Sequence, residues 1–299
     1  MPRKVGIFKA MEPTVFLGSA AVVVLFVGFG TLFTGHAADA FGSLQDFIIG
    51  HFGWFYVLTA TLLLVFVVWL LFSRYGEIRL GGDTAEPEFP YLAWLAMLFS
   101  AGMGIGLVFW GVAEPLTHLS TPPLAEPGSH EAAREAMRFA YFHWGLHPWA
   151  VYIVFGLSLA YFHYRHDLPL APRSLLYPFL GKRIYGLPGH LVDIVATVGT
   201  LFGVATSLGF GAMQINAGLG EVAGLPQATP IQVAIIASIT LVATISVVSG
   251  VQRGIRRLSE SNLLLAAVLL LFVFLTGPTV RLLDMFMSNL GEYLHQLQK

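Results

Sequence analysis

The sequence predicts an all-α polytopic membrane protein with about seven transmembrane helices. Hydrophobic residues make up 56% of the 299 residues and charged residues 11%, whereas about a quarter of the residues in a soluble domain are charged. The apolar residues gather in stretches that approach the roughly twenty residues needed to cross a bilayer. The chain contains no cysteine, which excludes disulfides, thiolate metal sites and a thiol nucleophile.

Seven apolar stretches account for the expected spans. In chain order, they cover residues 14–33, 54–72, 90–112, 144–162, 191–213, 231–249 and 262–276. The first stretch follows several basic residues and is too long for the apolar core of a cleaved signal peptide. We therefore expect it to remain in the protein as a membrane helix.

The positions of the basic residues indicate how these spans are oriented. With the N-terminus in the cytoplasm, twelve Lys and Arg side chains fall in cytoplasmic segments and four in outer segments. This asymmetry obeys the positive-inside rule. The sequence thus predicts a multi-pass protein of the inner (plasma) membrane with a cytoplasmic N-terminus. The lipid bilayer is its expected surrounding, and no nucleic-acid partner is expected.

Two segments outside the spans are predicted to be helical. In residues 127–138, Ser129 suits an N-cap, and acidic residues precede basic ones, as in a short external helix. A near match to the H-E-x-x-H zinc motif begins at His130, but Arg134 replaces its second histidine. Residues 281–297 have apolar side chains at helical spacing and are expected to lie along the outer interface. No phosphate loop or nucleophile elbow occurs, so we do not expect an enzyme.

The third span contains an unusual run of glycines. Gly102, Gly104 and Gly106 occupy alternate positions of the segment S-A-G-M-G-I-G, and each costs about 1 kcal/mol relative to alanine inside a helix. The first and last form G-x-x-x-G, which allows two membrane helices to pack closely without any binding site. A broken helix that presents bare backbone groups to a substrate is the alternative. The residues alone leave both interpretations open.

A cluster of aromatic residues begins the fourth span. Trp144, Trp149 and Tyr152 lie in F-H-W-G-L-H-P-W-A-V-Y, at offsets that cover an arc of about 140° on an ideal helix. Such rings can trap a quaternary ammonium group, with about 2 kcal/mol or more per desolvated ring. Tryptophan and tyrosine near the end of a span are also typical interfacial anchors. Both interpretations remain open at this point.

Several long segments resemble one transporter family. G-M-G-I-G-L-V-F-W-G-V-A-E-P-L (102–116) and H-W-G-L-H-P-W-A-V-Y (143–152) closely resemble the two hallmark segments of the betaine/carnitine/choline transporter family. Residues 74–82, 202–211 and 248–262 also agree with this family. The resemblance covers essentially the whole chain.

The resemblance implies a sodium-symporter type of fold, in which two leading helices precede two five-helix repeats of inverted topology. Residues 1–89 would contain the N-terminal tail, the leading helices and a cytoplasmic loop, and residues 90–277 would form the first repeat. Residues 278–299 would be an amphipathic external tail. Because the second repeat is absent from these residues, we expect a truncated form that does not transport alone. Relatives often assemble as homotrimers.

The resemblance also implies a symporter that moves quaternary ammonium compounds by alternating access. It assigns substrate-facing roles to Gly102, Met103, Gly104, Ile105, Gly106, Trp144, Trp149 and Tyr152. Choline carriers tend to have aspartate at the position of Gly106, where a carboxylate would balance a cation. A zwitterion brings its own carboxylate, so the glycine favours glycine betaine.

The coupling ion stays open between Na⁺ and H⁺, and no other cofactor is expected. The resemblance maps sodium ligands onto Ser100, Met103 and Thr200. Val204 stands where a second threonine of one sodium site would be. Glu114 and Asp193 are expected near the ends of their helices, and neither clearly suggests a proton relay.

Two other classes of seven-helix protein agree less well with the residues. A seven-helix photoreceptor needs a lysine in its last helix, and the span 262–276 has none. A non-transporting receptor or a channel is compatible with the number of spans, but a channel gives the aromatic cluster no role.

Overall fold

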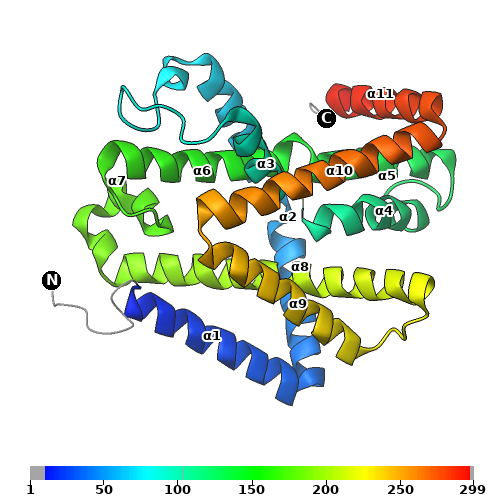
Figure 1. Ribbon diagram of the computed structural model, residues 1–299, viewed down its shortest axis with the longest axis horizontal. Helices are drawn as coiled ribbons and strands as arrows, with labels where there is room; N and C mark the ends of the chain where they lie inside the picture. Colours follow the sequence, from blue (N-terminus) through cyan, green and yellow to red (C-terminus); the bar gives the residue numbers. More distant parts are fainter. Residues whose placement is uncertain (1–10, 103, 297–299) are drawn as a thin grey trace. The chain divides into compact units, whose positions relative to one another are not determined.

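The structure is a computed structural model that describes residues 11–102 and 104–296. These residues form helices joined by loops, and no strand occurs among them (Figure 1). The chain divides into two compact units. Unit 1 comprises Met1–Ala85 and Leu146–Gly203, and unit 2 comprises Glu86–Gly145 and Val204–Lys299.

Unit 1 is built from long apolar helices. They are α1 (Pro13–Leu32), α2 (Thr34–Phe72), α6 (Leu146–His166) and the part of α8 (Leu187–Ala223) that ends at Gly203. Helix α2 packs along α6 and also contacts α1. Short helices link these elements: η2 (Arg74–Glu77), η3 (Pro172–Leu176), α7 (Tyr177–Leu180) and η4 (Gly181–Tyr185).

Unit 2 contains the segment with the alternating glycines. Its elements are α3 (Tyr91–Gly102), α4 (Ile105–Ser120), α5 (His130–Trp144), the rest of α8, α9 (Thr229–Val248), η5 (Val251–Ile255), α10 (Arg256–Thr276) and α11 (Thr279–Gln296). Helix α4 packs along α5, α10 lies beside α3, and α11 contacts α5 (Figure 1). Two candidate elements of the substrate site, α4 and the end of α5, are therefore neighbours within one unit.

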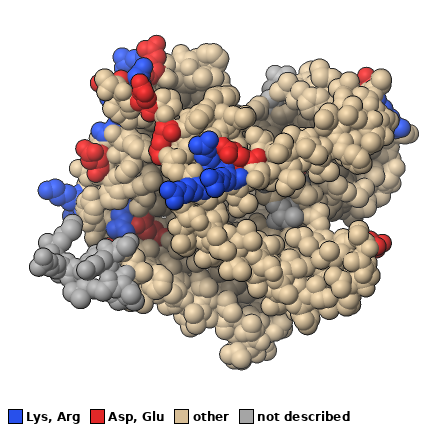
Figure 2. Space-filling model, in the orientation of Figure 1, with Lys and Arg blue, Asp and Glu red and all other residues tan. Residues whose placement is uncertain are grey.

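The helices have the surface properties of membrane spans. Among the described residues, six helical segments are long and apolar enough to cross a bilayer. They are Pro13–Leu32, Thr34–Phe72, His130–His166, Leu187–Ala223, Thr229–Val248 and Val251–Thr276. Most of their large apolar side chains are exposed, and uncharged residues form most of the visible surface in Figure 2. The prediction of an all-α polytopic membrane protein is confirmed.

The helix contacts use small side chains. Ala93 and Ala96 of α3 and Ala132 and Ala136 of α5 are buried, while many leucine and phenylalanine side chains face outward. Lipid chains are as apolar as leucine, so membrane helices associate through close packing of small residues rather than through burial of large ones.

Several observed helix boundaries differ from the expected ones. The third span, expected over 90–112, is divided into α3 and α4. The second helix begins at Thr34, about twenty residues before the expected start. The external helix does have Ser129 as its N-cap, whose hydroxyl accepts a hydrogen bond from the Ala132 backbone N–H at 3.0 Å, but it continues to Trp144. The amphipathic tail helix, α11, begins at Thr279, two residues before the expected start.

Candidate functional site

The helix interruption expected at the glycines is present. Helix α3 ends at Gly102 and α4 begins at Ile105. Gly104 between them has extended backbone angles (φ −95°, ψ −175°). Met103 and the side chain of Ile105 lie outside the described residues. In any α-helix the first four backbone N–H groups lack an intrahelical acceptor.

Trp144 lies against this interruption. A Cβ atom added to Gly106 would be 3.6 Å from Cη2 of the Trp144 indole, which is ordinary van der Waals contact. Gly106 is in the first turn of α4 and Trp144 ends α5. The structure therefore brings together two of the residues that the family resemblance assigned to the substrate site.

The same indole is held at its other edge by a buried carboxylate. Trp144 Nε1 donates a hydrogen bond to Glu114 Oε2 at 2.7 Å. Nδ1 of His143 lies 2.9 Å from the same oxygen, and Nε2 of His118 lies 3.6 Å from Oε1. The Glu114 residue is only 7% exposed. No set of three or more His, Asp or Glu side chains in the described part of the chain is arranged to hold a metal ion.

Glu114 is a buried residue of α4 that the sequence pattern did not single out. It was expected near a helix end, but it lies inside α4 and is buried between α4 and α5. Asp193, treated in the same way, is also buried and is ion-paired with Arg173. An ionisable side chain within a membrane segment is a candidate functional residue by default, and this rule would have singled out Glu114 from the sequence.

The other two aromatic candidates belong to unit 1. Trp149 and Tyr152 lie on α6, and their ring centroids are 5.9 Å apart with an angle of 46° between the planes. The side chains are exposed. Because Trp144 belongs to unit 2, the convergence of all three rings stays a prediction.

The candidate ion ligands are found in different environments. Ser100 in α3 donates a hydrogen bond to the Ser259 carbonyl at 3.4 Å and accepts one from Asn262 Nδ2 at 3.1 Å, which ties α3 to α10. Thr200 in α8 donates to the carbonyl of Ala196 in its own helix at 2.8 Å. A hydroxyl bonded in this way still has lone pairs for a cation. No sodium site is defined by these contacts.

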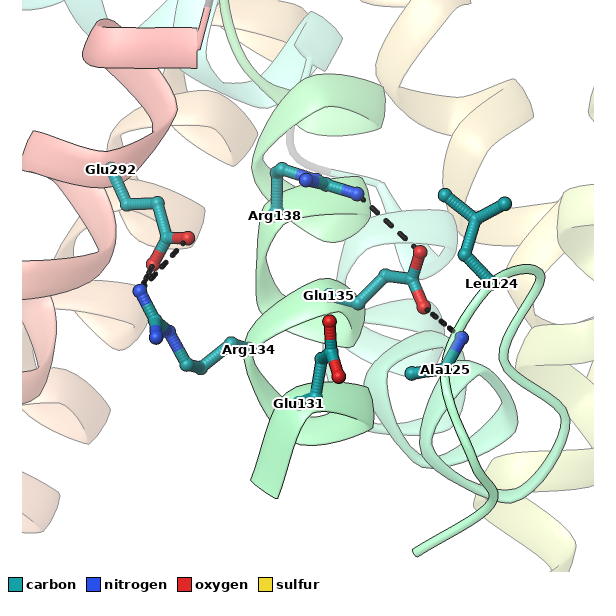
Figure 3. Close-up of a pocket in the computed structure, with 7 residues that line it drawn as sticks. All are labelled: Leu124, Ala125, Glu131, Arg134, Glu135, Arg138 and Glu292. Carbon is teal, nitrogen blue, oxygen red and sulfur yellow. Dashed lines mark hydrogen bonds and ion pairs between the residues drawn. The ribbon is translucent and has the colours of Figure 1, made fainter. Parts of the chain in front are cut away.

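Unit 2 also contains a hollow that is lined by charged side chains (Figure 3). It has a volume of about 280 Å³ and lies among α5, α11 and the loop that follows α4. Glu135 accepts hydrogen bonds from Arg138 and from the Ala125 backbone N–H, at 3.4 and 3.2 Å. Arg134 reaches Glu292 of α11 at 3.4 Å. The Arg134–Glu292 pair attaches α11 to α5, and none of the predicted substrate residues lines the hollow.

Asp83, in the loop between α2 and α3, forms an ion pair with Arg165 of α6 within unit 1. The hydrogen bond from Arg165 and the charge of that guanidinium hold the pKa of Asp83 below its ordinary value. The two side chains are 2.8 Å apart, and Asp83 is 87% exposed. Solvent screens such a pair, so its contribution to stability is small.

Comparison with known proteins places this chain in a family. A family model described as betaine/carnitine/choline family transporter matches residues 14–299. The chain is 45% identical to the glycine betaine transporter of Acinetobacter baylyi, over 97% of the chain and 44% of that protein. It is 46% identical to the high-affinity choline transport protein of Escherichia coli, over 96% of the chain and 42% of that protein.

An uncharacterised transporter of Mycobacterium tuberculosis is 49% identical to this chain, over 97% of the chain and 49% of its own length. The chain thus spans about half the length of the curated relatives it matches. The family model covers nearly all of it, and the residues of the glycine interruption and of the aromatic segment lie within the match. The chain belongs to the betaine/carnitine/choline transporter family.

Proposed function

We propose that the protein is a secondary active transporter that carries quaternary ammonium compounds across the inner membrane by alternating access. The observation that carries this proposal is the interrupted helix beside Trp144 in unit 2. Secondary transporters use broken helices to offer backbone groups to substrate and ion near the middle of the membrane. An aromatic ring next to such a break suits a cation that has no hydrogen to donate.

Glycine betaine is the proposed substrate. The proteins named above are a glycine betaine transporter and a choline transport protein, so similarity alone favours neither compound. Position 106, next to the Trp144 ring, carries a glycine and no carboxylate, and a zwitterion needs none at this position. The positive N-terminal end of α4 also suits the carboxylate of a betaine.

Coupling to Na⁺ or H⁺ completes the proposed mechanism. Backbone carbonyls at Ser100 and Met103 are the proposed ligands of one sodium site, and the hydroxyl of Thr200 is the proposed ligand of a second. Val204, in place of a second threonine, leaves H⁺ as the alternative. The basic residues support a cytoplasmic N-terminus, and assembly as a homotrimer follows from the family resemblance.

Reconstituted vesicles test the proposal. Uptake of labelled glycine betaine and choline is measured for the full-length protein, with sodium present or replaced by potassium at two external pH values. We expect saturable betaine uptake that choline inhibits weakly, and a requirement for either sodium or a proton gradient. Absence of saturable uptake of both compounds under all conditions would overturn the proposed function.

A parallel experiment addresses the 299 residues alone. We propose that they do not transport by themselves, because a site built between two repeats needs both of them and the relatives are about twice as long. Saturable betaine uptake by vesicles that contain only these residues would contradict this proposal.

A further inference from the structure

We propose that Glu114 is the positioning residue of the substrate site: its carboxylate holds the Trp144 indole against the glycine interruption. This inference rests on the proposed function, because the indole is taken to contact the quaternary ammonium group. Two distances from one ring carry the argument. Nε1 donates to Glu114 Oε2 at 2.7 Å, while Cη2 lies 3.6 Å from the Cβ position of Gly106.

The carboxylate is suited to this role because it is buried and well bonded. A buried charge is costly unless hydrogen-bond donors compensate it. Glu114 contacts the indole N–H, and the two imidazoles of His143 and His118 lie 2.9 and 3.6 Å from its oxygens. Hydrogen bonds to an ionised acceptor are shorter and about twice as strong as neutral ones. The indole therefore has a preferred orientation that packing alone would not impose.

The position of the ring has a direct consequence for binding. Trp144 is only partly buried, so part of its surface remains available to a ligand. The attraction between a cation and an aromatic ring depends on the cation lying over the ring face, within about 6 Å of the centroid. A ring that rotates away from Gly106 loses this geometry. A carboxylate at Nε1 also adds electron density to the ring, which strengthens its attraction for a cation.

The competing explanation is that Glu114 only joins α4 to α5. Both helices are packed along each other, and His143 alone could provide the link. Under this explanation, loss of the carboxylate would weaken transport whatever residue stands at position 144. Under the positioning role, the effect of the carboxylate passes through the indole N–H and disappears when that N–H is absent.

A double-mutant cycle in the full-length protein separates the two explanations. Glu114→Met removes the acceptor with an unbranched side chain, and Trp144→Phe removes the N–H but keeps a ring. We expect Glu114→Met to raise the KM for betaine uptake about tenfold in the parent and by less than about twofold in the Trp144→Phe background. Equal effects in both backgrounds would overturn the positioning role.

Two further variants keep the cycle interpretable. Glu114→Gln retains one oxygen for the indole N–H and is expected to fold normally, with a KM between those of the parent and Glu114→Met. Glu135→Gln is the matched control: Glu135 is also buried but bonds Arg138 and the Ala125 N–H instead of the indole. Its KM should stay within about twofold of the parent. A KM for Glu114→Gln equal to that of the parent, together with no effect of Glu114→Met, would also overturn the proposal.

A spectroscopic measurement distinguishes failure of this inference from failure of the proposed function. The protein is labelled with ¹⁵N at the tryptophan indoles, and the Trp144 signal is identified by its loss in Trp144→Phe. We expect its N–H proton to resonate downfield in the parent and to move upfield in Glu114→Met. An unchanged signal would refute the hydrogen bond itself. Absence of betaine uptake by the parent would instead refute the proposed function.

Discussion

The buried ion pair of unit 1 gives a quantitative prediction about stability. The Arg173 and Asp193 side chains are 11% and 7% exposed, and the Asp193 carboxylate also accepts a hydrogen bond from the Arg173 backbone N–H at 2.9 Å. Asp193→Asn keeps an oxygen for that N–H but removes the charge and turns an amide NH₂ toward Arg173 Nε. Breaking one side of a buried pair costs about 3–5 kcal/mol. We expect the lower part of this range, because one hydrogen bond is retained.

Thermal denaturation of the purified protein in detergent measures the effect. Asp193→Asn should lower Tm by on the order of 5 °C. Adding Arg173→Met to this variant should recover most of the loss, because no unpaired buried charge then remains while the backbone N–H keeps its acceptor.

Asp83→Asn serves as the control for this experiment. Its pair with Arg165 is exposed, and such pairs contribute little, so no measurable shift in Tm is expected. The reasoning fails if Asp193→Asn leaves Tm unchanged, or if the double variant is as unstable as the single one.

Three other predictions follow from individual contacts. Gly106→Asp in the full-length protein should shift preference toward choline, because the new carboxylate would balance the charge of a cation. The added Cβ would make only ordinary contact with the Trp144 indole, so the side chain fits. An unchanged choline-to-betaine ratio in competition uptake would reject this prediction. Asn216→Ala should destabilise the protein by about 2 kcal/mol, because the fully buried side chain bonds the carbonyl and the amide of the 226–228 loop at 3.1 Å; faster proteolysis within this loop provides the measurement. The lowered pKa of Asp83 means that its small contribution to stability is present above the pKa of the unfolded chain and is lost as pH falls through the folded pKa. An NMR titration should show the midpoint rising in Arg165→Gln, and an equal midpoint in both proteins would contradict the assigned cause.

The glycine interruption and the N-cap at Ser129 depend on residues that are close in the sequence. Three glycines on alternate positions weaken a helix through backbone entropy, but these residues alone left a broken helix and close helix packing both open, and the structure shows the break between α3 and α4. The N-cap at Ser129 was predictable from neighbouring residues, since its hydroxyl bonds an amide three residues ahead.

The contact of Glu114 with Trp144 could not be predicted from neighbouring residues. The two residues are thirty positions apart in the sequence, and their contact depends on the rotation and offset at which α4 packs against α5. Apolar composition and segment length fixed the membrane class and most of the spans, because transfer into lipid depends on residue type summed along each helix. The choice of which faces meet depends on the close packing of small side chains between helices. The packing of α4 against α5 brought the Glu114 carboxylate to the His143 imidazole and the Trp144 indole, and only the tertiary structure determined it.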